Sequence, residues 1–367
     1  MKHKLNERIK NFNITILISL FLLFSCGSGQ QPQAGKDGEA ATGGRSLSEV
    51  LMEVGRSAES AFYSFMELVS GTLGLRVTKD TTKQQVGVYF SGLGKKLGEA
   101  SDELEQVAKK SEIERSKDSL LNKVIKEAVD AAKITLSTLK GHLESLKDIG
   151  DDKVVGEAVS QQNGVAADET ELKKAYKALK GIVDTAKTQQ VKEPQKSEMT
   201  LAKASIGVDA KDGAKILAAG NNAGAAVGDK ASAIVSAVSG EEILASIVKS
   251  GENDAAVGAN ATADTTAMSF AKGGQAAHVS HSADAKAAAV AGGIALRSLV
   301  KDGKLAANND NDDKAVQGVG ITAVNKLLVA VEDIIKKTVK NVLEKAKGEI
   351  DKARGPQEPI SESSDKK

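Results

Sequence analysis

The sequence predicts an all-α fold, and three observations lead to this prediction. Apolar residues recur at spacings of three and four over several long stretches, which is the period of an amphipathic helix. Alternating β-branched and aromatic residues are scarce, and aromatic residues make up only 3% of the 367 residues. No proline interrupts the chain between residues 33 and 193. We therefore expect an elongated helical bundle with long N- and C-terminal helices and an Ala/Gly-rich centre of short helices and loops.

Residues 1–25 have the features of an export signal. An apolar stretch, residues 14–24, follows a segment with four positive charges, at Lys2, Lys4, Arg8 and Lys10. These eleven residues, which Ser19 interrupts, would form about 16 Å of helix, whereas the apolar core of a bilayer is about 30 Å thick. The segment is therefore expected to be a signal peptide and not a permanent membrane span.

Cys26 is the only cysteine of the chain and follows this apolar stretch directly. With Leu23 three residues before it and Ser25 just before it, the site resembles a bacterial lipobox, from which Phe24 departs. The resemblance implies that the thiol of Cys26 carries diacylglycerol and that its amine carries a further acyl chain. Two or three acyl chains hold a protein stably on a membrane, whereas one does so only marginally. The alternative is a cysteine that merely ends a signal peptide.

The charge of the mature chain supports a lipid anchor. Loss of residues 1–25 takes four positive charges and one negative charge from a chain of net charge +1, which leaves −2. A polybasic surface for electrostatic attachment to lipid headgroups is therefore not expected. The same balance lacks the basic excess of nucleic-acid-binding proteins, so no nucleic-acid partner is expected.

The mature chain divides into a tether, a domain and a tail. Residues 26–45 are rich in Gly, Ser, Gln and Ala, which predicts a flexible tether. Residues 46–354 are interpreted as a single helical domain, and residues 355–367 as a disordered tail. The first helix of the domain is expected to begin at the capping box that starts at Ser46 and to extend to about Val69.

Three further helices follow in the N-terminal half. The second is expected after Asp80, and the third spans about residues 117–146, both on the evidence of apolar stripes. The fourth begins at a second capping box, formed by Asp168 and Glu171. Pro194 lies in a polar stretch beyond this helix and is expected to mark a boundary.

Residues 201–320 have a different composition, with 32 Ala and 15 Gly. Ala favours helices and Gly opposes them, so the mixture predicts short helices joined by loops. A weak internal repeat relates residues 244–251 to residues 296–303, which suggests duplicated helix–loop units. The expected loops lie at residues 220–228, 251–264, 273–282 and 302–313.

A strong apolar stripe over residues 324–350 predicts a last helix of about thirty residues. Lysines gather in its second half, where cations interact favourably with the helix dipole. A solvated charged face explains these lysines better than a ligand site does. They are Lys336, Lys337, Lys340, Lys345 and Lys347.

The sequence offers little that could support catalysis, and we expect no cofactor. His278 and His281 are spaced for a metal, but no carboxylate or cysteine is spaced to complete the site. The glycines Gly92, Gly94 and Gly98 miss the dinucleotide-binding pattern, so close helix packing is the better interpretation. No serine stands in a nucleophile-elbow motif. An enzyme is therefore the weakest interpretation of this chain.

Three segments carry a resemblance to a known family: residues 51–55, residues 88–108 and residues 323–328. They resemble the variable large proteins of relapsing-fever Borrelia, within the variable major protein lipoproteins. The resemblance implies a helical outer-surface antigen that is anchored in the cell outer membrane by acyl chains on Cys26. It further implies antigenic variation, by which the spirochaete evades host antibodies. In this family the terminal helices would form a membrane-proximal stalk, and the variable centre would face outward.

Two hypotheses of function remain beside the enzyme. The first is the variable antigen, in which loops of residues 201–320 face antibody, because loops tolerate sequence change better than packed elements do. The second is an adhesin or a lipoprotein that binds host surface or plasma proteins. No sequence feature identifies a patch for such a host ligand.

Overall fold

The computed structural model describes four stretches of the chain, all of which belong to one unit, Ser46–Lys367. The described residues are 74–111, 120–161, 163–309 and 311–353. The predicted signal peptide, tether, first helix and tail lie outside the described residues.

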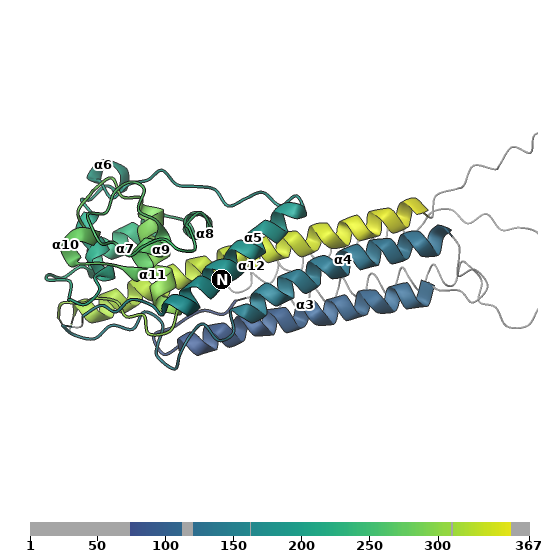
Figure 1. Ribbon diagram of the computed structural model, residues 1–367, viewed down its shortest axis with the longest axis horizontal. Coiled ribbons are helices and arrows are strands. Elements are labelled where there is room, and N and C mark those ends of the chain that lie inside the picture. The colour runs from purple at the N-terminus through teal and green to yellow at the C-terminus, as the bar shows by residue number, and fades with distance from the viewer. Residues whose placement is uncertain (1–73, 112–119, 162, 310, 354–367) are drawn as a thin grey trace, which may run out of the picture. The chain divides into compact units, whose positions relative to one another are not determined.

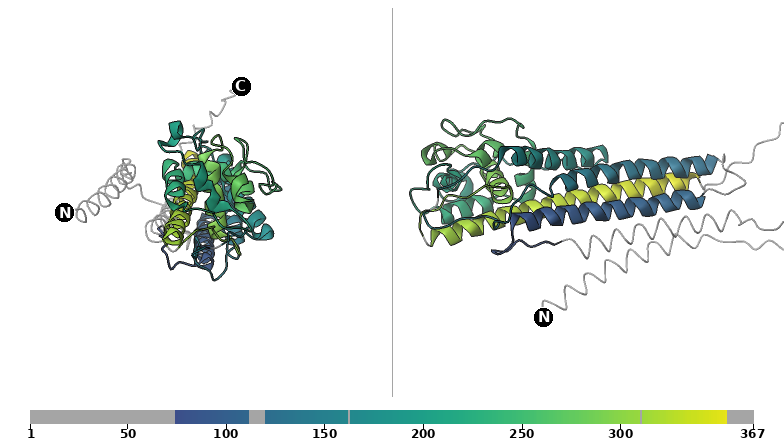
Figure 2. Two further views of the ribbon diagram at one scale, coloured as in Figure 1. Left: turned by 90° about the vertical axis from the view of Figure 1, so that its left-hand side faces the viewer. Right: turned by 60° about the horizontal axis from the view of Figure 1, so that its bottom comes forward.

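Three long helices form a bundle: α3 (Lys83–Ser111), α4 (Leu120–Ser145) and α12 (Asp312–Ala353). The helix α4 packs against both α3 and α12, and the three run side by side in both Figure 1 and Figure 2. With 42 residues, α12 is about 63 Å long at the usual rise per residue. The second and third helices predicted from the sequence are thus confirmed.

The core of the bundle is built from the predicted apolar stripes. Phe90 of α3, Leu139 of α4 and Val339 of α12 are completely buried. Burial of each large apolar side chain contributes about 1.5–3 kcal/mol. Other buried residues of these helices are Val86, Leu93, Leu97, Leu104, Ile125, Leu136, Leu143, Val331 and Val342. Of these, Ile125 does not belong to the predicted stripe, which contains Val124 instead, and Val124 is only partly buried.

Glycines allow α3 to approach α4 closely. A Cβ atom at Gly94 would lie 3.3 Å from the carbonyl oxygen of Lys140, and one at Gly98 would lie 3.3 Å from the Nζ of that lysine. At Gly92 nothing lies within 4 Å. The interpretation of these glycines as packing residues therefore holds at Gly94 and Gly98 and is wrong at Gly92.

The fourth predicted helix is α5 (Glu169–Thr188), which lies beside α4 and α12. As expected for its start, the carboxylate of Asp168 accepts a hydrogen bond of 2.9 Å from the backbone N–H of Glu171. The carboxylate of Glu171 instead accepts from the Nζ of Lys174, at 2.8 Å. The backbone N–H of Asp168 donates to the carbonyl of Lys301, at 2.9 Å. In a capping box the side chain of Glu171 would accept from the backbone N–H of Asp168. Here the distant carbonyl of Lys301 accepts that hydrogen bond instead.

The central cap, which we define as residues 201–309, contains the predicted short helices. Four of them, η1, α7, α8 and α9, pack against α11, all 13 residues of which are buried. Pro194 lies in the non-helical segment 189–202 that leads from α5 to the cap. In the described residues extended segments form only isolated β-bridges. The elements of the cap are α6 (Lys203–Ile206), η1 (Lys211–Leu217), α7 (Gly228–Ala237), α8 (Gly240–Val248), α9 (Ala267–Lys272), α10 (Ala276–Val279) and α11 (Ala287–Leu299).

Two predicted boundaries are wrong. The last helix starts at Asp312, well before residue 324, and α10 lies inside residues 273–282, which were expected to form a loop. Gly318 and Gly320 lie in the first turns of α12, where glycine disfavours a helix. Close packing at Gly320 compensates for this cost. A Cβ atom at Gly320 would lie 2.7 Å from the Cα of Gly156, so the glycine permits a close contact with the chain that crosses α12.

The repeated segments end two of the cap helices. The first covers the end of α8 at Val248, and the second covers the end of α11 at Leu299. In both, a lysine and then a glycine follow within four residues of the helix end. The helices α8 and α11 pack against each other.

No helix in the described part of the chain is by itself long and apolar enough to cross a bilayer. The pair α7 and α8, bent by 91° at its break, meets the length and composition criteria only when the two are taken together. Both helices bury apolar side chains in the cap, including Ile234 and Ile243, each at 0% exposure.

Candidate functional site

The predicted acylation site, Cys26, lies outside the described residues. Its modification therefore stays a prediction. The described residues include exposed side chains of the bundle and of the cap, together with the contacts that hold these side chains in place.

In the part of the chain that the structure describes, His278 and His281 belong to no cluster of side chains that could bind a metal ion. His278 lies in the last turn of the short helix α10, and the backbone N–H of His281 donates to the carbonyl of His278 at 3.3 Å. Among the residues that the structure describes, no three His, Cys, Asp or Glu side chains come together in an arrangement that could hold an ion.

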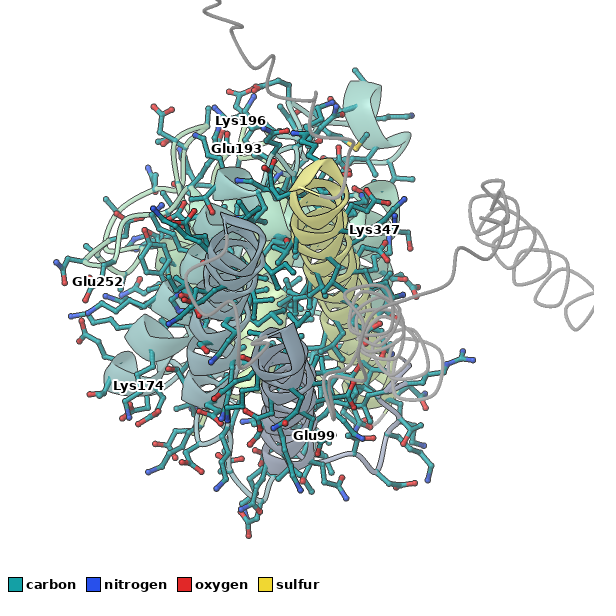
Figure 3. All side chains as sticks on the ribbon, turned by 90° about the vertical axis from the view of Figure 1, so that its right-hand side faces the viewer. Glu99, Lys174, Glu193, Lys196, Glu252 and Lys347 are labelled. Atoms are coloured by element: carbon teal, nitrogen blue, oxygen red, sulfur yellow. The ribbon has the colours of Figure 1, made fainter. Side chains whose placement is uncertain are left out.

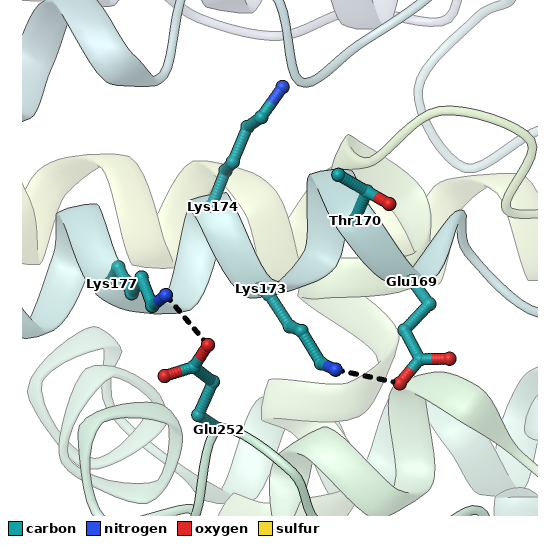
Figure 4. A pocket seen from close by; sticks show the side chains of 6 residues that line it. All are labelled: Glu169, Thr170, Lys173, Lys174, Lys177 and Glu252. Carbon is teal, nitrogen blue, oxygen red and sulfur yellow. Dashed lines mark ion pairs between the residues drawn. The ribbon is translucent and has the colours of Figure 1, made fainter.

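A shallow hollow of about 440 Å³ lies where α5 meets the cap (Figure 4). Lys177 pairs with Glu252 at 2.7 Å, and Lys173 pairs with Glu169 at 3.0 Å. Lys272 reaches the same carboxylate of Glu169 at 3.2 Å. Hydrogen bonds from Lys173 and Lys272 hold the pKa of Glu169 below its ordinary value. Each charged side chain that lines the hollow is paired with an opposite charge, so none requires a bound ligand to balance its charge.

The lysines of α5 are all neutralised in the same way. Each one forms an ion pair of 3.0 Å or less with a nearby carboxylate. Such exposed pairs contribute little to stability, so they indicate a solvated face. Figure 3 shows Lys174, Glu193 and Glu252 among the side chains at the rim of the molecule. The pairs are Lys173–Glu169, Lys174–Glu171, Lys177–Glu252, Lys180–Asp184 and Lys187–Glu193.

The cap presents a polar surface. Of the large apolar side chains that are exposed in the described residues, only Val208 belongs to the cap. Single exposed apolar residues are common on soluble domains and do not mark a binding site. The loops and helix faces of the cap therefore offer polar and small side chains to a partner.

A buried arginine links three parts of the cap. Arg297 of α11 is 0% exposed, and its Nε donates to the carbonyl of Ala271 at 2.9 Å. Its Nη1 donates to Ala218 at 2.8 Å, and its Nη2 donates to Phe270 at 3.3 Å. Burial lowers the pKa of Arg297 to about 9. Two of its acceptors lie at the C-terminal end of α9, where the helix dipole favours a cation.

A second buried cation links the cap to the start of α3. Lys83 is 0% exposed, and its Nζ donates to the carbonyl of Gly303 at 2.7 Å. The carboxylate of Asp151 lies 3.8 Å from the same Nζ. Burial lowers the pKa of Lys83. Sequence reasoning missed Arg297 and Lys83, and the only signal for Arg297 was one charge within an apolar helix.

The chain matches the Borrelia lipoprotein family over residues 58–350. It is 66% identical to variable large protein 25 of Borrelia hermsii over 361 residues, which cover 97% of this chain and 99% of that one. It is 63% identical to variable large protein 18 of the same organism, over 97% of this chain and 98% of that one.

More distant similarity extends to other proteins. Variable large protein 4 of Borrelia hermsii is 28% identical, over 88% of each chain. The crystal structure of the Lyme disease variable surface antigen VlsE of Borrelia burgdorferi superposes with a TM-score of 0.66. The alignment covers 83% of this chain and 98% of that one at 23% identity. At this identity the comparison supports the helical fold alone.

Proposed function

The chain belongs to the Borrelia lipoprotein family, and from this premise we propose that it is a lipid-anchored variable antigen of the spirochaete surface. In this proposal acyl chains on Cys26 hold the protein in the outer membrane. Replacement of one variant by another then lets the organism evade host antibodies. The family is one of surface antigens and not of enzymes.

The observation that carries the proposal is full-length similarity to proteins that are named for their variability. The match to variable large protein 25 leaves almost no part of either chain uncovered. The name of VlsE likewise describes that protein as a variable surface antigen. Both names suggest the same role for this chain.

The structure supports the proposal by separating a packed bundle from a polar cap. The bundle helices bury continuous apolar stripes, in which most substitutions would cost stability. The cap combines a buried small-residue core around α11 with exposed loops between its helices. Changes in these exposed residues can alter what an antibody contacts and leave the core intact.

The lipid anchor is tested at Cys26. Mass spectrometry of the native protein should find an N-terminal Cys26 that carries acyl chains, and Cys26→Ala should release the protein from the detergent-extractable membrane fraction. An unmodified first residue in the native protein would contradict the anchor.

Antigenic variation is tested by exchange of segments. Residues 201–320 of this chain would be replaced by the corresponding segment of variable large protein 25, and antisera raised against the native protein would be titrated against the chimera. We expect a large loss of antiserum binding. The matched control exchanges α3 and α4 of the packed bundle, residues 83–111 and 120–145, and should lose much less. Unchanged binding by the chimera with exchanged residues 201–320 would reject the proposal.

A further inference from the structure

Helix α3 has a buried side that does not point at α4. Its contact with α4 runs along Gly94 and Gly98, where a Cβ atom would lie 3.3 Å from atoms of Lys140. Ala100 follows Gly98 by two residues, which turns it about 160° around the helix axis and away from α4. Ala100 is nevertheless only 4% exposed. An element other than α4 therefore covers this side of α3.

The same side of α3 continues in both directions from Ala100. Tyr89 lies three turns before Ala100, and Glu103 lies about one turn after it. The hydroxyl of Tyr89 donates to the carboxylate of Glu332 on α12, so this side is turned towards α12. Oε2 of Glu103 is buried and has no hydrogen-bond partner among the described residues.

Helix α12 presents a matching apolar stripe. Val339, Leu343 and Ala346 follow Glu332 at helical spacings of seven, four and three residues, which places them on one side of α12. None of the three is more than 8% exposed. We define the α3–α12 face as Tyr89, Ala100 and Glu103 of α3 together with Glu332, Val339, Leu343 and Ala346 of α12.

The described helices do not account for the burial of this face. Both α3 and α12 pack along α4, whereas direct contact between α3 and α12 is slight. Apart from α4 and a small contact with α11, none of the described helices packs appreciably against α3. The α3–α12 face therefore needs a further packing partner from outside the described residues.

The chain that precedes α3 leads towards this face. Nε2 of Gln317 donates to the carbonyl of Lys79 at 2.9 Å. The side chain of Asn325 accepts from the backbone N–H of Val77 at 2.8 Å and donates to its carbonyl at 3.0 Å. From Lys79 back to Val77, the contacts thus move along α12 towards its C-terminal end.

Gly74 continues this path to the α3–α12 face. Its backbone lies next to the carboxylate of Glu332 and next to the hydroxyl of Tyr89. The residues before Gly74 therefore enter the face at these two side chains. The direction of the path takes them towards Ser111 and Ala353, the ends of α3 and α12.

The predicted first helix has the length to occupy the face. It covers residues 46–69, which form about 36 Å of helix. From Tyr89 to Ser111, α3 continues for about 33 Å, and from Glu332 to Ala353, α12 continues for about 32 Å. The predicted helix has a single apolar stripe, so it has one side to bury against a partner.

We propose that residues 46–69 dock on the α3–α12 face as a fourth helix of the bundle, antiparallel to both α3 and α12. The occupant is this segment of the same chain and not a second copy, because Gly74 already lies at one end of the face. Docking buries Phe62 and Phe65 of the apolar stripe. It also brings Ser46, where the predicted tether ends, to the end of the bundle that lies away from the cap (Figure 1).

The docking is tested by thermal unfolding of the whole mature chain, residues 26–367, with Cys26→Ala. Phe62→Ala and Phe65→Ala should each lower the melting temperature by about 4–8 °C, because each removes a buried ring. The control Tyr63→Ala removes a ring from the opposite side of the same predicted helix and should shift the melting temperature by less than about 2 °C. Phenylalanine variants that shift it no more than the control would overturn the docking.

Crosslinking tests which surface the segment occupies. In the same Cys26→Ala chain, Val69→Cys and Lys336→Cys supply the only two thiols, and a short bifunctional maleimide is added. Lys336 lies one turn after Glu332, so we expect a crosslinked monomer. The control pairs Val69→Cys with Lys337→Cys, which is exposed and about 100° further around α12, and it should crosslink much less.

Two results of the crosslinking would overturn the proposal. Equal yields from the two pairs would show that the segment does not lie on the α3–α12 face. A crosslinked dimer in place of the monomer would show that the segment of a second copy occupies it. Neither experiment uses an antibody, so these outcomes are separate from the test of antigenic variation.

Discussion

The hydroxyl of Tyr89 on α3 donates a hydrogen bond to the carboxylate of Glu332 on α12, 243 positions further along the chain. It joins two helices that both pack against α4. Burial raises the pKa of Tyr89, and burial also raises the pKa of Glu332. The pair therefore places a phenol and a carboxylate where neither is well solvated.

Removal of the phenol should cost stability. Tyr89→Phe keeps the ring but leaves the buried carboxylate of Glu332 without its donor, which costs about 1–3 kcal/mol of unfolding free energy. Chemical denaturation at neutral pH measures the effect. The double variant Tyr89→Phe, Glu332→Gln should recover part of the loss, because an amide is cheaper to bury than a carboxylate. A loss in the double variant larger than in Tyr89→Phe would contradict this account.

The raised pKa of Glu332 predicts a dependence on pH. The folded state binds this proton more tightly than the unfolded chain does, so the carboxyl contributes stability at low pH. That contribution is lost as the pH rises from the ordinary value of 4.5 through the raised pKa. Native protein should therefore become less stable relative to Glu332→Gln over this interval. A difference in unfolding free energy between the two that stays constant from pH 4 to pH 7 would show that the pKa is not raised.

Arg297 should be required for a stable cap. In Arg297→Met three buried carbonyls lose their donor, and we expect the unfolding free energy to fall by about 2–4 kcal/mol. The control Arg76→Met changes an exposed arginine and should have an effect below about 0.5 kcal/mol. Equal effects of the two substitutions in denaturant unfolding would show that the buried contacts contribute nothing.

Two glycines of α3 should respond in opposite directions to the same substitution. A Cβ atom at Gly87 would lie 2.1 Å from the carbonyl oxygen of Lys147, so Gly87→Ala should separate the two segments and lower the melting temperature. At Gly92 nothing lies within 4 Å, and Gly92→Ala should stabilise the helix by about 0.5–1 kcal/mol. Thermal unfolding of the two variants side by side tests the pair. Equal shifts of the same sign would contradict the packing at Gly87.

Much of the fold could be predicted from local patterns. The positions of α3, α4 and α5 follow from apolar residues at helical spacing, because that signal lies within a few turns of one segment. The start of α5 follows from Asp168, whose capping contact spans only three residues. The short helices of the cap follow from the mixture of Ala and Gly. Membership of the family rests on the same kind of information, the order of residues along the chain.

The contacts that hold the cap could not be predicted in this way. Asp312 lies 84 residues from Gly228, Lys326 lies 88 residues from Val238, and Arg297 lies 79 residues from Ala218. Their partners are backbone atoms, which every residue has, so no pattern of residue types marks them. The sequence by itself determined the positions of the long helices α3, α4 and α5, and it predicts a lipid attachment at Cys26. Only the tertiary structure decided which charged side chains meet which helix ends, because that depends on how distant segments pack.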